Sequence, residues 1–192
     1  MGKALPVTGL DAFTFERWVL HGKPELLAGK TPVETFPGHG TSGTPPDGLT
    51  GIVKAHGKDG IPFVVIDGKT GGEIAYITVS TYGRAVPLPY YSFNRTVGCP
   101  PFFNVGRQDV PVIERAAADG VPVTLRDEVE FIPDTPTGSV FGVLPGKTAD
   151  EILFIAHLDT VYNSPGANDN TASVIAMLML AHAFSGTTPE KT

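Results

Sequence analysis

The sequence predicts an α/β protein in which a β-rich module precedes a smaller α/β layer. Short runs of β-branched and aromatic residues, separated by turn signals, fill the chain up to about residue 135. The continuous apolar run at residues 151–156 is typical of a strand buried on both faces. The apolar segment at residues 171–184 then predicts a buried helix, as expected in a layered α/β fold.

Composition excludes one large class of partners. The chain has 192 residues, of which 14 are Lys or Arg and 20 are Asp or Glu, so its formal net charge is −6. This charge argues against a basic nucleic-acid-binding protein. Hydrophobic residues make up 41% of the chain, enough for a packed core, while 23 Gly and 18 Pro predict many turns. We therefore expect a globular chain that binds no nucleic acid.

Cysteine content and hydropathy add further expectations. Cys99 is the single cysteine of the sequence, so an intramolecular disulfide and a Cys-rich zinc cluster are both impossible. The first residues lack the apolar run of a signal peptide, and no segment reaches 18 apolar residues. We expect no membrane partner and leave the compartment open. An extracellular location, compatible with a truncated N-terminus, would give meaning to the glycosylation acceptor at Asn94.

The first eighty residues contain one ambiguous segment, one loop and two strands. Residues 11–20 fit either a short helix or a strand, and both interpretations stay open. Residues 35–51 are rich in Gly and Pro and predict a surface loop in which His39 is solvated. Residues 61–66 and 73–80 are rich in β-branched and aromatic side chains, and they predict two strands joined by a short loop.

A helix, a strand and a turn-rich stretch come next. Asp109 as N-cap and Gly120 as the stop signal predict one short helix between them. In residues 121–131, apolar and polar side chains alternate, which indicates a half-buried strand with one solvated face. Residues 132–138 contain Pro, Thr and Gly and predict a junction between domains.

We expect two domains that meet at this junction. Residues 1–135 would form the β-rich domain with an N-terminal extension, and residues 136–192 the α/β domain. Within the second domain, residues 139–144 and 151–156 predict strands. The helix at residues 171–184 is too short to cross a bilayer, which again favours a buried position.

The residues that carry chemistry lie after the predicted strand 151–156. His157 and Asp159 stand two residues apart at its C-terminal end, the edge where open α/β sheets build their sites. A carboxylate there can orient a metal-binding imidazole. Asp169 follows in a loop that can return toward His157, and a carboxylate can bridge two metals. Two simpler interpretations stay open, namely that residues 168–170 only cap the next helix and that His157 and Asp159 are solvated.

The order and spacing of these residues resemble a known peptidase family. Residues 144–146, residues 150–161 and the segment Ser164-Pro-Gly-Ala-Asn-Asp-Asn170 before an Ala-rich helix are similar to the opening of the catalytic domain of the M28 family of zinc peptidases. The resemblance implies that His157 is a zinc ligand and that Asp159 is the active-site aspartate that orients it. It also implies that Asp169 bridges two zinc ions.

The upstream residues resemble the protease-associated (PA) domain that often precedes this catalytic core. The similarity lies in residues 45–53, 61–67 and 103–109, with the helix and strand that follow them. The resemblance implies that residues 1–135 form a PA-like domain. It also implies that residues 136–192 are the incomplete start of an α/β zinc-exopeptidase domain.

The function implied is that of a zinc-dependent exopeptidase of the aminopeptidase type, acting on peptides or proteins. The family's remaining ligands and its Glu-Glu pair are expected beyond the last helix, because His182 fits a core histidine and Glu190 belongs to a frayed tail. We therefore expect the chain alone to be inactive and to self-associate through its apolar helix. The alternative is a non-catalytic PA-like module that binds a peptide or protein.

Overall fold

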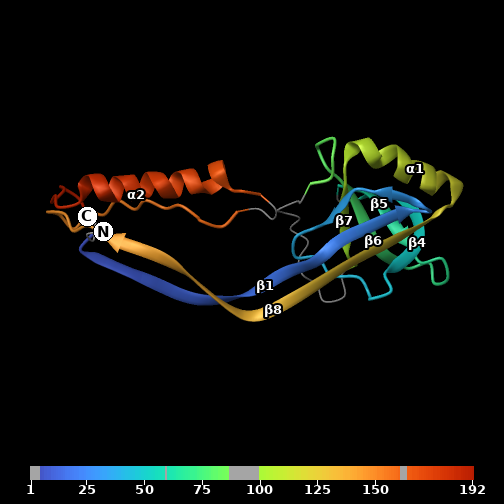
Figure 1. Ribbon diagram of the computed structural model, residues 1–192, viewed down its shortest axis with the longest axis horizontal. Coiled ribbons are helices and arrows are strands. Elements are labelled where there is room, and N and C mark those ends of the chain that lie inside the picture. Colours follow the sequence, from blue (N-terminus) through green and yellow to red (C-terminus); the bar gives the residue numbers. More distant parts are fainter. Residues whose placement is uncertain (1–4, 59, 87–99, 161–163) are drawn as a thin grey trace. The chain divides into compact units, whose positions relative to one another are not determined.

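The computed structural model describes residues 5–58, 60–86, 100–160 and 164–192 (Figure 1). Cys99 and the acceptor at Asn94 lie outside the described residues. A one-turn 3-10 helix (Arg107–Asp109) precedes α1, and a π-helical turn (Ala167–Thr171) precedes α2. The other elements, in chain order, are β1 (Val7–Ala28), β2 (Thr31–Val33), β3 (Thr35–Pro37), β4 (Leu49–Lys58), β5 (Ile61–Ile66), β6 (Glu73–Val79), β7 (Phe102–Val105), α1 (Val110–Asp119), β8 (Pro122–Val143) and α2 (Ala172–Phe184).

The described strands form a mixed sheet in the order β2-β1-β8-β4-β5-β6-β7-β3. β4 pairs with β5 and β5 with β6 in antiparallel fashion, whereas β6 and β7 are parallel with Ile77 opposite Phe103. The parallel pair needs a long connection, and residues 80–101 provide it. The sheet and its helices confirm the predicted α/β class.

The chain divides into two compact units. One is Arg17–Ile132, and the other combines Met1–Glu16 with Pro133–Thr192. Strands β1 and β8 each contribute residues to both units because each is 22 residues long. The predicted domains, 1–135 and 136–192, stay a prediction about which parts fold independently.

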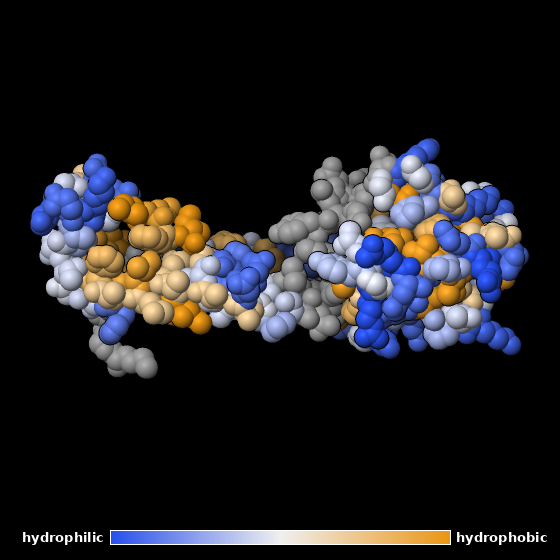
Figure 2. Space-filling view, turned by 90° about the horizontal axis from the view of Figure 1, so that it is seen from above, coloured by the Kyte–Doolittle hydropathy of each residue, from blue (hydrophilic) through white to orange (hydrophobic). Residues whose placement is uncertain are grey.

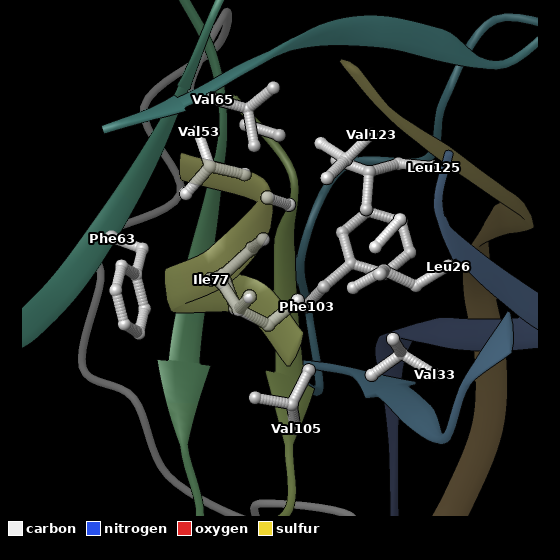
Figure 3. Packing of buried hydrophobic residues seen from close by; sticks show 14 residues of the cluster. Leu26, Val33, Val53, Phe63, Val65, Ile77, Phe103, Val105, Val123 and Leu125 are labelled. Carbon is white, nitrogen blue, oxygen red and sulfur yellow. The ribbon is translucent and has the colours of Figure 1, made fainter. Parts of the chain in front are cut away.

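The hydrophobic core lies in the Arg17–Ile132 unit, between the sheet and α1. Side chains from the central strands converge there, and α1 contributes Ile113 and Ala116 (Figure 3). Fully buried members include Leu26, Val53, Val65, Ile77, Phe103, Val105, Ile113, Val123 and Leu125. Burial of this many aliphatic and aromatic side chains, each worth about 1.5–3 kcal/mol relative to exposure, is the main source of stability for the unit.

Elements with a strong local signal form as predicted. Residues 61–66 and 73–79 are strands, and the apolar run of β5 is largely buried. Helix α1 has a proline in its first turn and ends at Gly120, whose φ of 63° is the left-handed conformation that glycine adopts most readily. His39 is exposed as predicted, and its ring lies 5.1 Å from that of Trp18.

Residues 11–20 and residues 132–138 both lie in long strands. The first assignment decides between two open interpretations, and the second differs from the predicted turns. Residues 11–20, which fitted helix or strand, lie within β1. Residues 132–138, predicted to be turn-rich, lie in β8 instead, while the domain junction expected there stays a prediction. Pairing of β8 with β4 runs over Pro122–Leu125, and β1 is the other neighbour of β8 in the sheet. Turn composition was therefore a wrong guide at Pro133 and Pro136.

The apolar segments of the other unit are exposed rather than buried. Residues 151–156, predicted as a buried strand, are not a strand in the described structure. Helix α2 forms as predicted but has no buried residue, and hydrophobic side chains lie on the surface of this unit (Figure 2). Leu178 and Met179 of α2 are 66% and 67% exposed. Both corrections have one physical cause, because a two-sided apolar strand and an all-apolar helix need partner elements that the described residues do not provide. In the described part of the chain, no helix is long and apolar enough to span a membrane.

A buried carboxylate connects β8 to the loop after β3. Asp127 falls on the inward face of β8, two residues after Leu125, and is 5% exposed. Its Oδ1 accepts a hydrogen bond from the Thr44 N–H at 2.8 Å, and the Thr44 hydroxyl donates to the Asp127 carbonyl at 2.9 Å. The other carboxylate oxygen, Oδ2, is buried and has no hydrogen-bond partner among the described residues. Burial raises the pKa of the Asp127 carboxyl, against the opposing effect of the Thr44 hydrogen bonds.

This raised pKa predicts a pH dependence of stability. The folded chain binds the Asp127 proton more tightly than the unfolded chain, so the contribution is most favourable below the ordinary aspartate pKa of about 4 and is lost as pH rises through the raised value. We expect wild-type stability to fall relative to Asp127→Asn as the pH rises above about 4. Urea unfolding followed by the fluorescence of Trp18, the single tryptophan, measures the difference at each pH.

Asp67→Asn is a control of opposite sign. The backbone N–H groups of Thr70 and Lys69 bond to this exposed carboxylate and lower its pKa. Its contribution is present above the ordinary aspartate pKa and is lost as pH falls. Wild-type stability should therefore rise relative to Asp67→Asn as pH increases. An Asp127→Asn difference that does not change with pH would contradict the prediction.

Candidate metal centre

The segment that carries the candidate site is held by the C-terminal residues of the chain. The backbone N–H of Thr148 donates to the carbonyl of Glu190 at 3.0 Å, and the N–H of Ile152 donates to the carbonyl of Thr192 at 2.7 Å. The Glu190 carboxylate lies 3.1 Å from Lys147 Nζ. The tail predicted to be frayed is therefore hydrogen-bonded in the described structure. Glu190 is paired with a lysine and plays no part in the site.

His157 lies between two aspartates. Its Nε2 is 3.1 Å from Asp169 Oδ1, and its Nδ1 is 3.5 Å from Asp159 Oδ1. The atom nearest to Nδ1 is the backbone carbonyl oxygen of Asp159, at 2.9 Å. The structure thus brings all three predicted site residues together. At Nδ1 it places the carbonyl of Asp159, rather than the Asp159 carboxylate, at hydrogen-bond distance.

The loop before α2 returns Asp169 to His157. Gly166 precedes the π-helical turn, within which Asp169 and Asn170 have non-helical dihedral angles and are joined by a cis peptide bond. None of these residues makes a side-chain hydrogen bond that caps the helix. The capping interpretation of residues 168–170 therefore has no support in the described geometry, whereas the approach to His157 does.

The hydrogen-bond partners of His157 determine where its protons lie. A carbonyl oxygen can only accept a hydrogen bond, so Nδ1 carries a proton toward Asp159. Nε2 then faces the carboxylate oxygen of Asp169, which is also an acceptor. Two acceptors at 3.1 Å repel one another unless a proton or a cation lies between them. The geometry therefore creates a place for a shared positive charge.

The separation fits zinc as well as a proton. Zinc binds imidazole nitrogen and carboxylate oxygen at about 2.0–2.2 Å, so two such ligands of one tetrahedral ion lie roughly 3.3 Å apart. The observed 3.1 Å is close to this value. Imidazole with its far N–H held by a carbonyl is also a common zinc-ligand arrangement. The donor set is therefore compatible with zinc at His157 and Asp169.

The described residues supply only part of a metal site. Among them, no group of three or more His, Cys, Asp and Glu side chains is arranged to hold a metal. The side chains of His157, Asp159 and Asp169 are 51%, 88% and 80% exposed, so water competes with every ligand. His182, predicted as a core histidine, is exposed on α2 and makes no ion pair given by the structure. A structural zinc site uses four ligands and a catalytic site three plus water, and these residues provide two.

A comparison with known families matches the segment that carries the site. Residues 139–192 match the model of peptidase family M28. His157, Asp159 and Asp169 all lie within the matched residues, and so does the loop between them. A comparison with curated proteins found no match to the chain.

Solved structures share the fold over nearly the whole chain. A Peptidase M28 precursor from Shewanella amazonensis SB2B has a TM-score of 0.68 at 18% identity, covering 97% of this chain and 53% of that protein. An aminopeptidase from Aneurinibacillus sp. strain AM-1 has a TM-score of 0.71 at 17% identity, with 96% and 51% covered. BSAP, a zinc aminopeptidase from Bacillus subtilis, has a TM-score of 0.64 at 20% identity, with 96% and 49% covered. The chain spans about half the length of these three proteins.

Proposed function

We propose that this chain is part of a zinc-dependent exopeptidase of the aminopeptidase type. The observation that carries the proposal is the approach of His157 Nε2 to Asp169 Oδ1, at 3.1 Å, with Nδ1 2.9 Å from the carbonyl oxygen of Asp159. The match of residues 139–192 to the M28 family model and the likeness in fold to two aminopeptidases support it. The substrates would be peptides or proteins.

Each site residue has a separate role in the proposed chemistry. His157 would present the Nε2 lone pair, and the Asp159 carbonyl would keep the proton on Nδ1 and fix the ring orientation. Asp169 would neutralise part of the positive charge and, through its two carboxylate oxygens, bridge two ions. Zinc bound here supplies a water of lowered pKa and polarises the scissile carbonyl. The general base and the remaining ligands are not among these three residues.

Zinc affinity tests the proposal directly. We expect the 192-residue chain to bind zinc weakly, because two ligands are fewer than the three or four that hold zinc firmly. His157→Ala should lower that affinity by about 100-fold or more, beyond the 10–100-fold typical of an outer-shell change. Competition with a chromophoric chelator measures both values.

His182→Ala is the matched control for this experiment. His182 is also an exposed histidine of the same unit, and it lies on α2 away from the site. Its removal should leave zinc affinity unchanged. Equal losses in the two variants would mean that zinc binds exposed histidines without a site. In the longer protein of which this chain would be part, hydrolysis of aminoacyl and N-acetylated aminoacyl nitroanilides then tests the exopeptidase assignment, since an aminopeptidase requires the free amino group.

A further inference from the structure

Gly166 is a buried residue in the loop before α2. Its neighbours Pro165 and Ala167 are exposed, and so is Asp169. Gly166 has a φ of 63°, in the left-handed region that favours glycine. A Cβ atom built on Gly166 would lie 2.7 Å from both Cβ and Oγ1 of Thr160. Both the backbone conformation and the available space therefore require glycine at this position.

The contact joins the two segments that carry the site. Thr160 directly follows Asp159, and Gly166 comes three residues before Asp169. Hydrogen bonds fix the Gly166 peptide groups on both sides, since its N–H donates to Ser164 Oγ at 3.3 Å and its carbonyl accepts from the Thr171 N–H at 3.0 Å. Asp169 lies within the turn that the second bond closes. A displacement of Gly166 therefore moves Asp169 relative to His157.

We propose that Gly166 and Thr160 form a positioning contact that sets the distance between His157 Nε2 and Asp169 Oδ1. This inference rests on the proposed function, and it adds two residues that touch neither metal nor substrate. Ordinary van der Waals contact of a Cβ begins at 3.4 Å, so an added methyl group at 2.7 Å forces the two segments apart by about 0.7 Å. The distances from zinc to its ligands normally stay within about 0.2 Å of their usual values. The separation caused by the added methyl group is larger than this range, so we expect it to weaken zinc binding at His157 and Asp169.

Gly166→Ala, measured against Gly186→Ala, tests the proposal. Gly186 has a φ of 76° in the same unit, and a Cβ there would meet nothing within 4 Å. The two variants share the strain of a left-handed alanine, and only Gly166→Ala meets Thr160. We expect Gly166→Ala to lower zinc affinity by about 10–100-fold, as outer-shell changes do, and Gly186→Ala to leave it unchanged.

Thr160→Gly provides a rescue that a general loss of folding would not show. It removes all three Thr160 atoms that an alanine at position 166 would meet. The double variant Gly166→Ala with Thr160→Gly should recover zinc affinity toward that of Thr160→Gly alone. Failure of the rescue, equal losses in Gly166→Ala and Gly186→Ala, or wild-type affinity in Gly166→Ala would each overturn the proposal.

A measurement without metal separates this inference from the proposed function. The imidazole nitrogen resonances of His157 in the zinc-free chain, assigned with His157→Ala, report on the Asp169 contact at Nε2. We expect Gly166→Ala to shift the Nε2 resonance and Gly186→Ala to leave it in place. If the wild-type chain binds no zinc, the proposed function fails, and the resonance shift alone then decides the positioning contact. An unshifted resonance in Gly166→Ala would overturn it.

Discussion

Replacing Phe103 by alanine is expected to lower the free energy of unfolding of the Arg17–Ile132 unit by about 3–5 kcal/mol. Phe103 is 0% exposed on β7, opposite Ile77 on β6 and Pro37 on β3. Figure 3 shows its ring among the side chains of the core cluster. Because neighbours on both sides belong to hydrogen-bonded strands, the structure can close the cavity only in part.

Trp18 allows this loss to be measured in the intact chain. It lies in the same unit, where its indole N–H donates to the Thr41 carbonyl at 3.0 Å. Urea unfolding followed by its fluorescence should give a lower midpoint for Phe103→Ala with an unchanged slope. Tyr82→Ala also removes an aromatic ring, but from a side chain that is 64% exposed, and should change stability by less than about 0.5 kcal/mol. Similar losses in the two variants would contradict the assigned core.

The elements that the sequence could predict are those with local signals. The apolar run of β5 and the Pro and Gly boundaries of α1 specify structure without distant partners. β1 could not be assigned in this way, because residues 11–20 become a strand through pairing with β8, more than 100 residues later. The same distant pairing turns Pro133 and Pro136 into strand residues. Pairing between remote segments is not visible in composition or periodicity.

The sequence was enough to predict which residues form the candidate site. It was not enough to predict which of their atoms are in contact. The spacing of His157, Asp159 and Asp169 indicated that an imidazole and carboxylates could meet, and the structure brings them together. It could not indicate that the carbonyl of Asp159 is the atom nearest to Nδ1, because a backbone atom leaves no mark on residue choice. Gly166 did carry a signal in the Pro-Gly pair, which also fits an ordinary turn. Its contact with Thr160 depends on three-dimensional placement.

Replacing Gly106 by alanine is expected to destabilise the Arg17–Ile132 unit by about 3 kcal/mol. Gly106 is buried between β7 and α1, and a Cβ built there would meet the Gly83 carbonyl and lie 2.6 Å from Arg84 Cα. Backbone atoms cannot rotate away as a side chain can. The added methyl group must therefore separate the two segments and lengthen the hydrogen bonds from the N–H groups of Arg107 and Gln108 to the carbonyls of Tyr82 and Gly83, now 3.1 and 3.0 Å.

Gly83→Ala is the matched control, because it adds a methyl group on the other side of the same contact. A Cβ built on Gly83 meets nothing within 4 Å, and the residue is exposed. This variant should stay within about 0.5 kcal/mol of wild type in the Trp18 unfolding experiment. Hydrogen exchange at the N–H groups of Arg107 and Gln108 should accelerate in Gly106→Ala and not in Gly83→Ala. Wild-type stability in Gly106→Ala would mean that the two backbone segments are not in contact in solution.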